Sequence, residues 1–293
     1  MTRGDRTHIR FGISLPNFGQ LASPDNIVRI AEEADELGYD SLWVAERLMV
    51  PEPPNQSWSK RDPTAFEPLV TLSHVAARTS NIGLGTSIVI LPVRNPMLLA
   101  RTAASVDVLS GGRLELGVGV GWMKEEMKIS NVPFPERGRI ADDYIEALRD
   151  IWQGRGHDGD HVQIPDNQFE PRPLNGSIPI WIGGNSDAAL RRVASLGDGW
   201  VPMGSFSPGE LKAKVETIRK RARRLDRDPA EISISCNIQF SLDDLKGGSA
   251  IDEIERYASS GASQILPRFD YSSASQLLEF MDQFASSILP SFR

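Results

Sequence analysis

The clearest candidates for chemistry in this sequence are a glutamate and an arginine that stand side by side. Glu46 and Arg47 directly follow an apolar run that predicts a strand at Ser41–Ala45. A carboxylate in that position could transfer a proton, and a guanidinium could hold an anionic or carbonyl-bearing substrate. The same two residues could instead form an ion pair that orders the start of the following loop. Both interpretations stay open on the residues alone.

Several other classes of chemistry lack the residues that they need. No lysine occurs in any predicted strand, and the sequence contains no His-x-His, His-Glu-x-x-His or Gly-x-Ser-x-Gly, which argues against a Schiff-base aldolase, a metal hydrolase and a serine hydrolase. Cys236 is the only cysteine, which excludes an intramolecular disulfide and a thiolate-rich metal centre. His157 and His161 are expected to be solvated loop residues, with no metal site. We therefore expect a site that binds, with the difficult chemistry left to a cofactor.

Two glycine-rich segments fit a cofactor-binding protein. Residues 117–121 read Gly-Val-Gly-Val-Gly, but the spacing and the strand position are wrong for a dinucleotide-binding fingerprint. Gly183, Gly184, Asn185 and Ser186 join a predicted strand to a predicted helix. The free N–H groups of such a turn can hold an anion, although a plain tight turn has the same pattern.

The elements that position these residues alternate along the chain. Eight short β-branched or apolar runs predict strands at Ile9–Leu15, Ser41–Ala45, Ile82–Ile90, Leu114–Val120, Pro179–Gly183, Trp200–Met203, Ile232–Phe240 and Ser263–Pro267. Each run precedes a stretch of helical periodicity, at Pro24–Leu37, Ala65–Arg78, Pro96–Leu109, Ile140–Trp152, Asp187–Leu196, Pro208–Leu225, Ser249–Ser259 and Ser275–Leu289. Eight βα units predict an α/β fold, a (β/α)8 TIM barrel formed by residues 1–293 as a single domain.

Two connections are too long for simple turns. Residues 47–64 follow the second predicted strand and contain several prolines, whereas residues 154–178 precede the fifth and resemble a small hairpin. The first connection lies on the face of a barrel that carries active sites, so a lid is favoured over a tolerated insertion. For the second connection a surface insertion is favoured.

Charge and hydropathy limit the partners. The formal net charge is -7, without the basic surface that nucleic acid or anionic membranes require. No apolar run approaches the length of a membrane span, and the first ten residues lack a signal-peptide core. We expect a cytoplasmic protein whose partner is a small-molecule substrate.

Six strings in order resemble the luciferase-like monooxygenase superfamily between about Phe11 and Pro202. They are Gly-Tyr-Asp-Ser-Leu-Trp-Val from residue 38, Leu-Gly-Thr-Ser-Ile-Val-Ile-Leu-Pro from 84, Leu-Ser-Gly-Gly-Arg-Leu from 109, Gly-Val-Gly-Val-Gly-Trp from 117, Pro-Ile-Trp-Ile-Gly-Gly from 179 and Gly-Asp-Gly-Trp from 197. The resemblance implies a (β/α)8 barrel that binds FMN or the deazaflavin F420 at the carboxyl ends of the strands. We also expect that the chain can assemble as a homodimer.

Within the superfamily, the chain is most similar to the F420-dependent oxidoreductases. This likeness rests on Pro-Val-Arg-Asn-Pro from residue 92 and on the Gly-Val-Gly-Trp form of the fourth strand. Bacterial luciferases carry an arginine for the FMN phosphate at the position of Val120. The resemblance implies hydride transfer between C5 of F420 and a small organic substrate. The alternatives are an FMN-dependent monooxygenase, a cofactor-free hydrolase using Glu46 and Asp270, and a catalytically silent flavin-binding protein.

The resemblance also assigns the cofactor-binding residues. A non-prolyl cis peptide is implied at Ser87-Ile88, against the central ring of the deazaflavin. The turn from Gly183 to Ser186 would hold the phosphate, and Gly119 and Gly121 would let the cofactor approach the fourth strand. Asn17 and Val120 complete the expected set.

The end of the second strand departs from the family pattern. Many relatives carry a histidine there beside the reacting ring, whereas this chain has Glu46 and Arg47. Arginine does not release a proton near neutral pH. We therefore expect Glu46 to take the proton-transfer role and Arg47 to fix the substrate.

Overall fold

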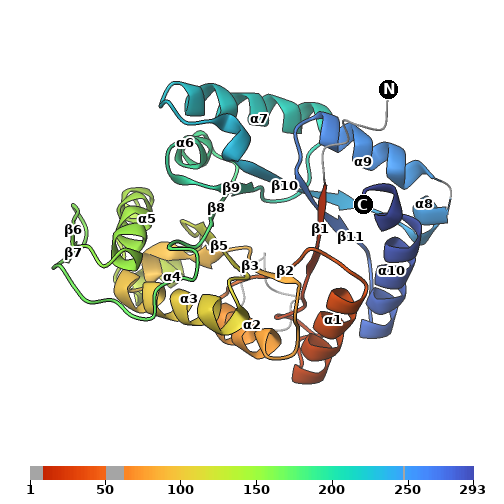
Figure 1. Cartoon of the computed structure of the whole chain (residues 1–293), viewed down its shortest axis with the longest axis horizontal. Coiled ribbons are helices and arrows are strands. Elements are labelled where there is room, and N and C mark those ends of the chain that lie inside the picture. The colour runs from red at the N-terminus through yellow and green to blue at the C-terminus, as the bar shows by residue number, and fades with distance from the viewer. Residues whose placement is uncertain (1–8, 51–62, 247) are drawn as a thin grey trace.

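Parallel strands close into a barrel with helices around it (Figure 1). The structure is a computed structural model that describes residues 9–50, 63–246 and 248–293. The barrel strands are β1 (Arg10–Ser14), β2 (Ser41–Val44), β3 (Gly83–Thr86), β4 (Val89–Ile90), β5 (Leu114–Gly119), β8 (Ile180–Gly183), β9 (Gly199–Val201), β10 (Ser233–Gln239) and β11 (Gln264–Arg268). β3 and β4 are two parts of one interrupted strand, and β11 pairs with β1 to close the ring. The predicted (β/α)8 barrel is confirmed.

Several helices begin at capping residues that can be read from the sequence. They are α1 (Pro24–Glu36), α2 (Pro68–Ala76), α3 (Pro96–Ser110), α4 (Lys124–Ile129), α5 (Arg137–Trp152), α6 (Asp187–Leu196), α7 (Pro208–Arg223), α8 (Leu242–Lys246), α9 (Ser249–Ser259) and α10 (Ala274–Ser287). Ser23 caps α1, and Ser207 forms a capping box with Glu210 at the start of α7, which satisfies amides that have no intrahelical acceptor. The short helices α4 and α8 were not predicted.

Two tryptophans fill the interior of the barrel. The rings of Trp43 on β2 and Trp181 on β8 meet edge to face with centroids 5.3 Å apart. Each ring lies beside a glycine in register on the next strand, Gly85 for Trp43 and Gly199 for Trp181. A Cβ on Gly199 would lie only 2.3 Å from the Trp181 ring. These glycines therefore leave the space in which the indoles pack, and the interior is a packed core rather than a pore.

The insertion before the fifth strand of the barrel is the predicted hairpin, made of β6 (His157–Asp158) and β7 (Gln163–Ile164). In Figure 1 it lies at the outer edge of the molecule, beside α5. The prediction that His157 is a solvated loop residue is wrong. Its ring nitrogens lie 2.9 Å from Asp150 and 2.8 Å from Asp143, both on α5, and its side chain is 8% exposed. Burial lowers the pKa of His157, but the two carboxylates outweigh burial and raise it.

Residues 51–62 of the predicted lid lie outside the described residues. The described residues contain no group of histidine, cysteine and acidic side chains arranged to hold a metal. None of the described helices combines the length and the apolar character that crossing a membrane requires.

Candidate functional site

A cavity of about 760 Å³ opens at the carboxyl ends of the barrel strands. Its lining includes Ile90 of β4, the segment Ser87-Ile88 between β3 and β4, and residues from every other strand of the ring or from the loop that follows it. Val201 and Leu266 belong both to this lining and to the cluster that contains the two tryptophans. The packed interior is therefore the floor of the cavity. The size lies within the range of small-molecule and cofactor sites.

The interrupted strand forms one wall of the cavity. β3 ends at Thr86 and β4 begins at Val89, and the peptide bond between Ser87 and Ile88 is cis, as expected. The Ser87 N–H donates to the carbonyl oxygen of Val44, at 2.6 Å, and ties this segment to β2. Ser87 and Ile88 both line the cavity.

The glycines near this wall have a packing role. A Cβ on Gly119 would lie 2.8 Å from Ile88, and one on Gly183 would lie 2.7 Å from the same side chain. Gly121 has a φ of +70°, and its Cβ would meet Met127 at 2.5 Å. These glycines leave room for protein side chains as well as lining the cavity. Their contact with a cofactor remains a prediction.

The turn between β8 and α6 forms one end of the cavity. Gly183, Gly184, Asn185 and Ser186 all line it. Gly184 has a φ of +114°, which favours glycine, and the Ser186 hydroxyl accepts the N–H of Ala189 and caps α6. The Asn185 side chain exchanges two hydrogen bonds with the backbone of Met203, at 2.7 and 2.9 Å. The turn is thus held rigidly with the first amides of α6 beside the cavity.

Two arginines line the same part of the cavity. Arg137, at the start of α5, donates to the carbonyl oxygens of Gly121 and Phe134 and stacks on the Phe134 ring. Arg192, on α6, pairs with Asp142. A helix start flanked by guanidinium groups is a donor set that fits a phosphate. The residues present therefore fit the phosphate group of a flavin or deazaflavin.

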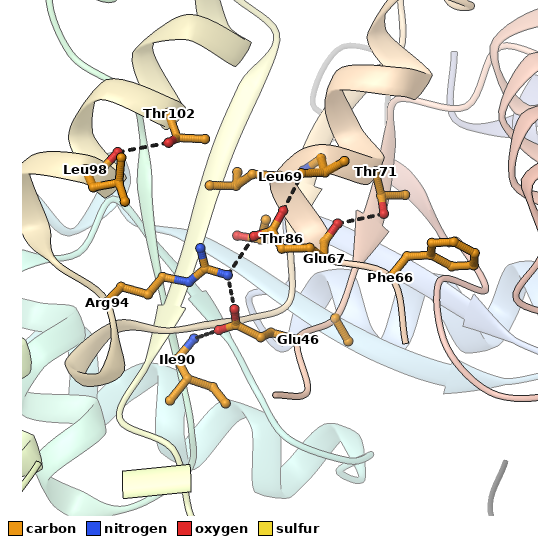
Figure 2. A network of polar contacts seen from close by, with 12 residues as sticks. Glu46, Phe66, Glu67, Leu69, Thr71, Thr86, Ile90, Arg94, Leu98 and Thr102 are labelled. Atoms are coloured by element: carbon orange, nitrogen blue, oxygen red, sulfur yellow. Dashed lines mark hydrogen bonds and ion pairs between the residues drawn. The ribbon is translucent and has the colours of Figure 1, made fainter. Parts of the chain in front are cut away.

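Glu46 lies in a network of charged groups at another wall (Figure 2). One carboxylate oxygen accepts the N–H of Ile90, and the other pairs with Arg94. Arg94 also pairs with Glu67, at 2.7 Å, and Glu67 caps the start of α2. The Glu46 side chain is 1% exposed, and burial raises the pKa of its carboxyl, although Arg94 and the Ile90 N–H oppose this.

Arg47 is held by a helix that was not predicted. Its guanidinium lies 3.1 Å from the carboxylate of Glu126 on α4 and 5.0 Å from the centre of the Trp122 ring. The other oxygen of Glu126 accepts the N–H of Leu48, at 2.9 Å. β2 ends at Val44, so Glu46 and Arg47 both belong to the following loop and both line the cavity.

The structure does not bring every predicted residue to the cavity. Asn17 is fully buried and is not among the lining residues. Its side chain exchanges hydrogen bonds with the backbone of Ala45 and also donates to Phe66. The prediction that Asn17 binds the cofactor is therefore not supported, because its side-chain amide already makes the hydrogen bonds that join the ends of β1 and β2.

Other lining residues were missed by sequence reasoning. Phe18, Arg137, Arg192, Asn237 and Arg268 all line the cavity. For Arg268 a signal was available, because it follows the last predicted strand. Arg137 and Arg192 lie on helices, and only the folded chain brings them to the cavity.

Comparison with known proteins agrees with this architecture. A family model described as luciferase-like monooxygenase matches residues 9–284. An uncharacterized protein of Mycobacterium tuberculosis is 30% identical over 256 residues, which cover 83% of this chain and 84% of that protein. The F420-dependent glucose-6-phosphate dehydrogenase of Amycolatopsis mediterranei is 29% identical over 227 residues, covering 75% of this chain and 66% of that enzyme.

Solved structures show the same fold. An F420-dependent secondary alcohol dehydrogenase in complex with an F420-acetone adduct superposes with a TM-score of 0.80 at 16% identity, covering 97% of this chain and 99% of that one. The oxygenating constituent of 3,6-diketocamphane monooxygenase from Pseudomonas putida, in complex with FMN, gives a TM-score of 0.72 at 15% identity, covering 97% and 98%. At these identities the likeness concerns the fold alone.

Proposed function

The chain belongs to the luciferase-like monooxygenase family, and on that premise we propose that it is an F420-dependent oxidoreductase acting on a small organic substrate. When bound, F420 supplies a carbon, C5, that accepts or donates a hydride. The relatives named as F420-dependent glucose-6-phosphate dehydrogenases support this assignment. The finer choice between F420 and FMN rests on the residues of the cavity.

The observation that carries the proposal is the donor set at one end of a single cavity. The α6 start and Arg137 would hold the cofactor phosphate there. Ile88 and Val120 would supply apolar contacts for a planar ring in the same cavity. An anion-binding end continuous with an apolar wall suits an elongated ligand that carries one phosphate and one ring system.

Val120 supports F420 over FMN. The resemblance places the arginine that holds the FMN phosphate of bacterial luciferases at this position, and here the residue is an aliphatic side chain that lines the cavity. A side chain without charge offers no ion pair to an FMN phosphate at this position. The chain is therefore better suited to the deazaflavin.

Glu46 is the residue that we propose moves the proton. Each of its carboxylate oxygens already accepts one hydrogen bond, from the Ile90 N–H or from Arg94, and each oxygen retains a further lone pair. In the oxidation of an alcohol the carboxylate would accept the hydroxyl proton, and in the reverse reaction the acid would return it. A pKa raised by burial brings the group closer to the neutral pH at which both forms are useful.

An FMN-dependent monooxygenase remains the second candidate, because a structural neighbour holds FMN in the same fold. The cofactor-free hydrolase loses its support. Glu46 lines the cavity and is paired with Arg94, whereas Asp270 is exposed and is not among the lining residues. The two carboxylates are therefore not assembled across one cavity, as a paired-carboxylate hydrolysis requires.

A turnover assay tests the proposed activity. Purified protein is mixed with oxidised F420 and a panel containing propan-2-ol, lactate, glucose and glucose 6-phosphate, and the absorbance of oxidised F420 is followed. We expect at least one alcohol to bleach F420 without consuming oxygen. Transfer of an oxygen atom from O2 to a compound of the panel in the presence of reduced FMN, above a control without protein, together with no bleaching of F420, would favour the monooxygenase.

A further inference from the structure

The last strand of the barrel places a cation in the cavity that the proposed cofactor site does not use. Side chains of β11 alternate between the helices and the barrel interior. Leu266 packs with Trp43 and Trp181 in the interior, and Arg268, two residues on, lines the cavity above it. Arg268 is exposed, so its guanidinium is accessible from the open end of the barrel.

The charges that line the cavity are unbalanced. Among the described lining residues, the only carboxylate is Glu46, and it is paired with Arg94. Of the arginines in the lining, Arg47 is paired with Glu126 and Arg192 with Asp142. The remaining two are Arg137, beside the α6 start, and Arg268.

Arg268 has no carboxylate partner within the part of the chain that the structure describes. The two positions in the cavity that can take an anion are separate. β11 lies three strands from β8 in the ring, with β9 and β10 between them. The anion end at α6 follows β8, whereas Arg268 ends β11.

The residues that line the cavity from the two strands beside β11 are neutral and polar. Asn237 lines the cavity from β10 and Ser14 from β1, and both strands pair with β11. Asn237 donates its amide to the carbonyl oxygen of Gly204, at 3.0 Å, which fixes the side chain. An arginine flanked by neutral hydrogen-bonding groups, with no carboxylate of the described residues within salt-bridge distance, suits a carboxylate or phosphoryl group.

We propose that Arg268 binds an anionic group of the substrate, so that the enzyme selects small organic acids or phosphate esters over neutral alcohols. This inference rests on the proposed function, because that function assigns the α6 end to the cofactor. Arg268 is then a specificity-determining residue in a separate part of the cavity. Its guanidinium would hold the substrate by an end that does not react.

Anion binding to the F420-loaded protein tests the inference. Calorimetric titrations use inorganic phosphate and malonate, at constant ionic strength in chloride, for the wild type, Arg268→Gln and Arg268→Lys. We expect the loaded wild type to bind at least one of the two anions, and Arg268→Gln to raise its Kd at least tenfold. Arg268→Lys should lose less, because it keeps the charge but not the planar fork. The affinity for F420 should be the same in all three proteins.

A matched control removes an arginine elsewhere. Arg256 lies on α9, is largely exposed and pairs with Glu253 three residues earlier. Arg256→Gln should bind both anions as the wild type does, which separates a site effect from the loss of one positive charge. The comparison between phosphate and malonate tells a phosphoryl group from a carboxylate.

Two results would overturn the inference: a loaded wild type that binds neither anion, or an Arg268→Gln variant that binds them as tightly as the wild type. Failure of F420 to bind would contradict the proposed function instead. In that case the unloaded wild type would still bind at least one of the two anions more tightly than the unloaded Arg268→Gln variant does. The two failures are therefore distinguishable.

Discussion

At the scale of single residues, Glu46 places a buried carboxylate at the wall of the cavity, where it accepts hydrogen bonds from the Ile90 N–H and from Arg94. Its position directly after a strand, where a barrel carries its chemistry, is readable from the apolar run that precedes it. Its partner Arg94 is 48 residues further along the chain, and no local pattern links the two. The burial that raises the Glu46 pKa is likewise a property of the folded chain. Sequence reasoning could therefore nominate the residue but not describe its environment.

Replacing Glu46 tests its role as the group that moves the proton. For alcohol oxidation, the ionised carboxylate is the active form, so kcat/KM should rise as the pH passes through the raised pKa of Glu46. Glu46→Gln should lower turnover by about 100-fold and abolish this limb of the pH profile, with F420 affinity nearly unchanged. The measurements are the pH dependence of kcat/KM and a fluorescence titration with F420.

Glu67→Gln is the matched control, because Glu67 also pairs with Arg94 but is not among the residues that line the cavity. It should change turnover far less and should keep the pH profile. If Glu46→Gln instead turns over as the wild type does, Glu46 only holds the Ile90 N–H and Arg94 in place. The proton would then come from water or from the substrate.

At the scale of elements, the turn before α6 was predictable and the helices around it were only partly so. The Gly-Gly-Asn-Ser string marks a strand-to-helix turn, and the structure places Ser186 as the cap of α6. α5 begins at Arg137, three residues before the prediction, because Glu136 makes no side-chain capping bond that would mark the start. α4 has only six residues, too few for a clear helical period. Arg137 and Glu126 were missed for these reasons.

The turn before α6 gives a test of the phosphate site. In Gly184→Val the new side chain would enter a turn with a φ of +114°, with its Cβ 3.4 Å from that of Ala189. We expect F420 affinity to fall at least tenfold while the melting temperature of the apoprotein falls by only a few degrees. The strain of about 1–2 kcal/mol is small for a chain of this size. Titration and thermal unfolding provide the two readouts.

Gly38→Val is the control for the backbone strain alone. Gly38 has a φ of +79° and nothing within 4 Å of its Cβ position, and it follows α1 outside the cavity. It should lower the melting temperature similarly and leave F420 affinity unchanged. Equal F420 affinities for Gly184→Val and the wild type would mean that the turn only joins β8 to α6.

At the scale of the whole molecule, the barrel followed from the alternation of strand and helix patterns, whereas its interior did not. The predicted strands lie within a few residues of those observed, because β-branched runs and helix caps are local signals. The packing of Trp43 against Gly85 and of Trp181 against Gly199 depends on the register between neighbouring strands. Register is set by pairings distant in sequence, and so the floor of the cavity could not be read in advance.

The central claim, that this cavity is built for the deazaflavin, is tested most directly by equilibrium titration of the purified apoprotein with F420 and, separately, with FMN. The α6 turn and Arg137 offer donors to a phosphate, and Val120 offers no cation to that of FMN. We predict that F420 binds at least tenfold more tightly than FMN, a difference of about 1.4 kcal/mol. Equal affinities, or tighter binding of FMN, would contradict the account.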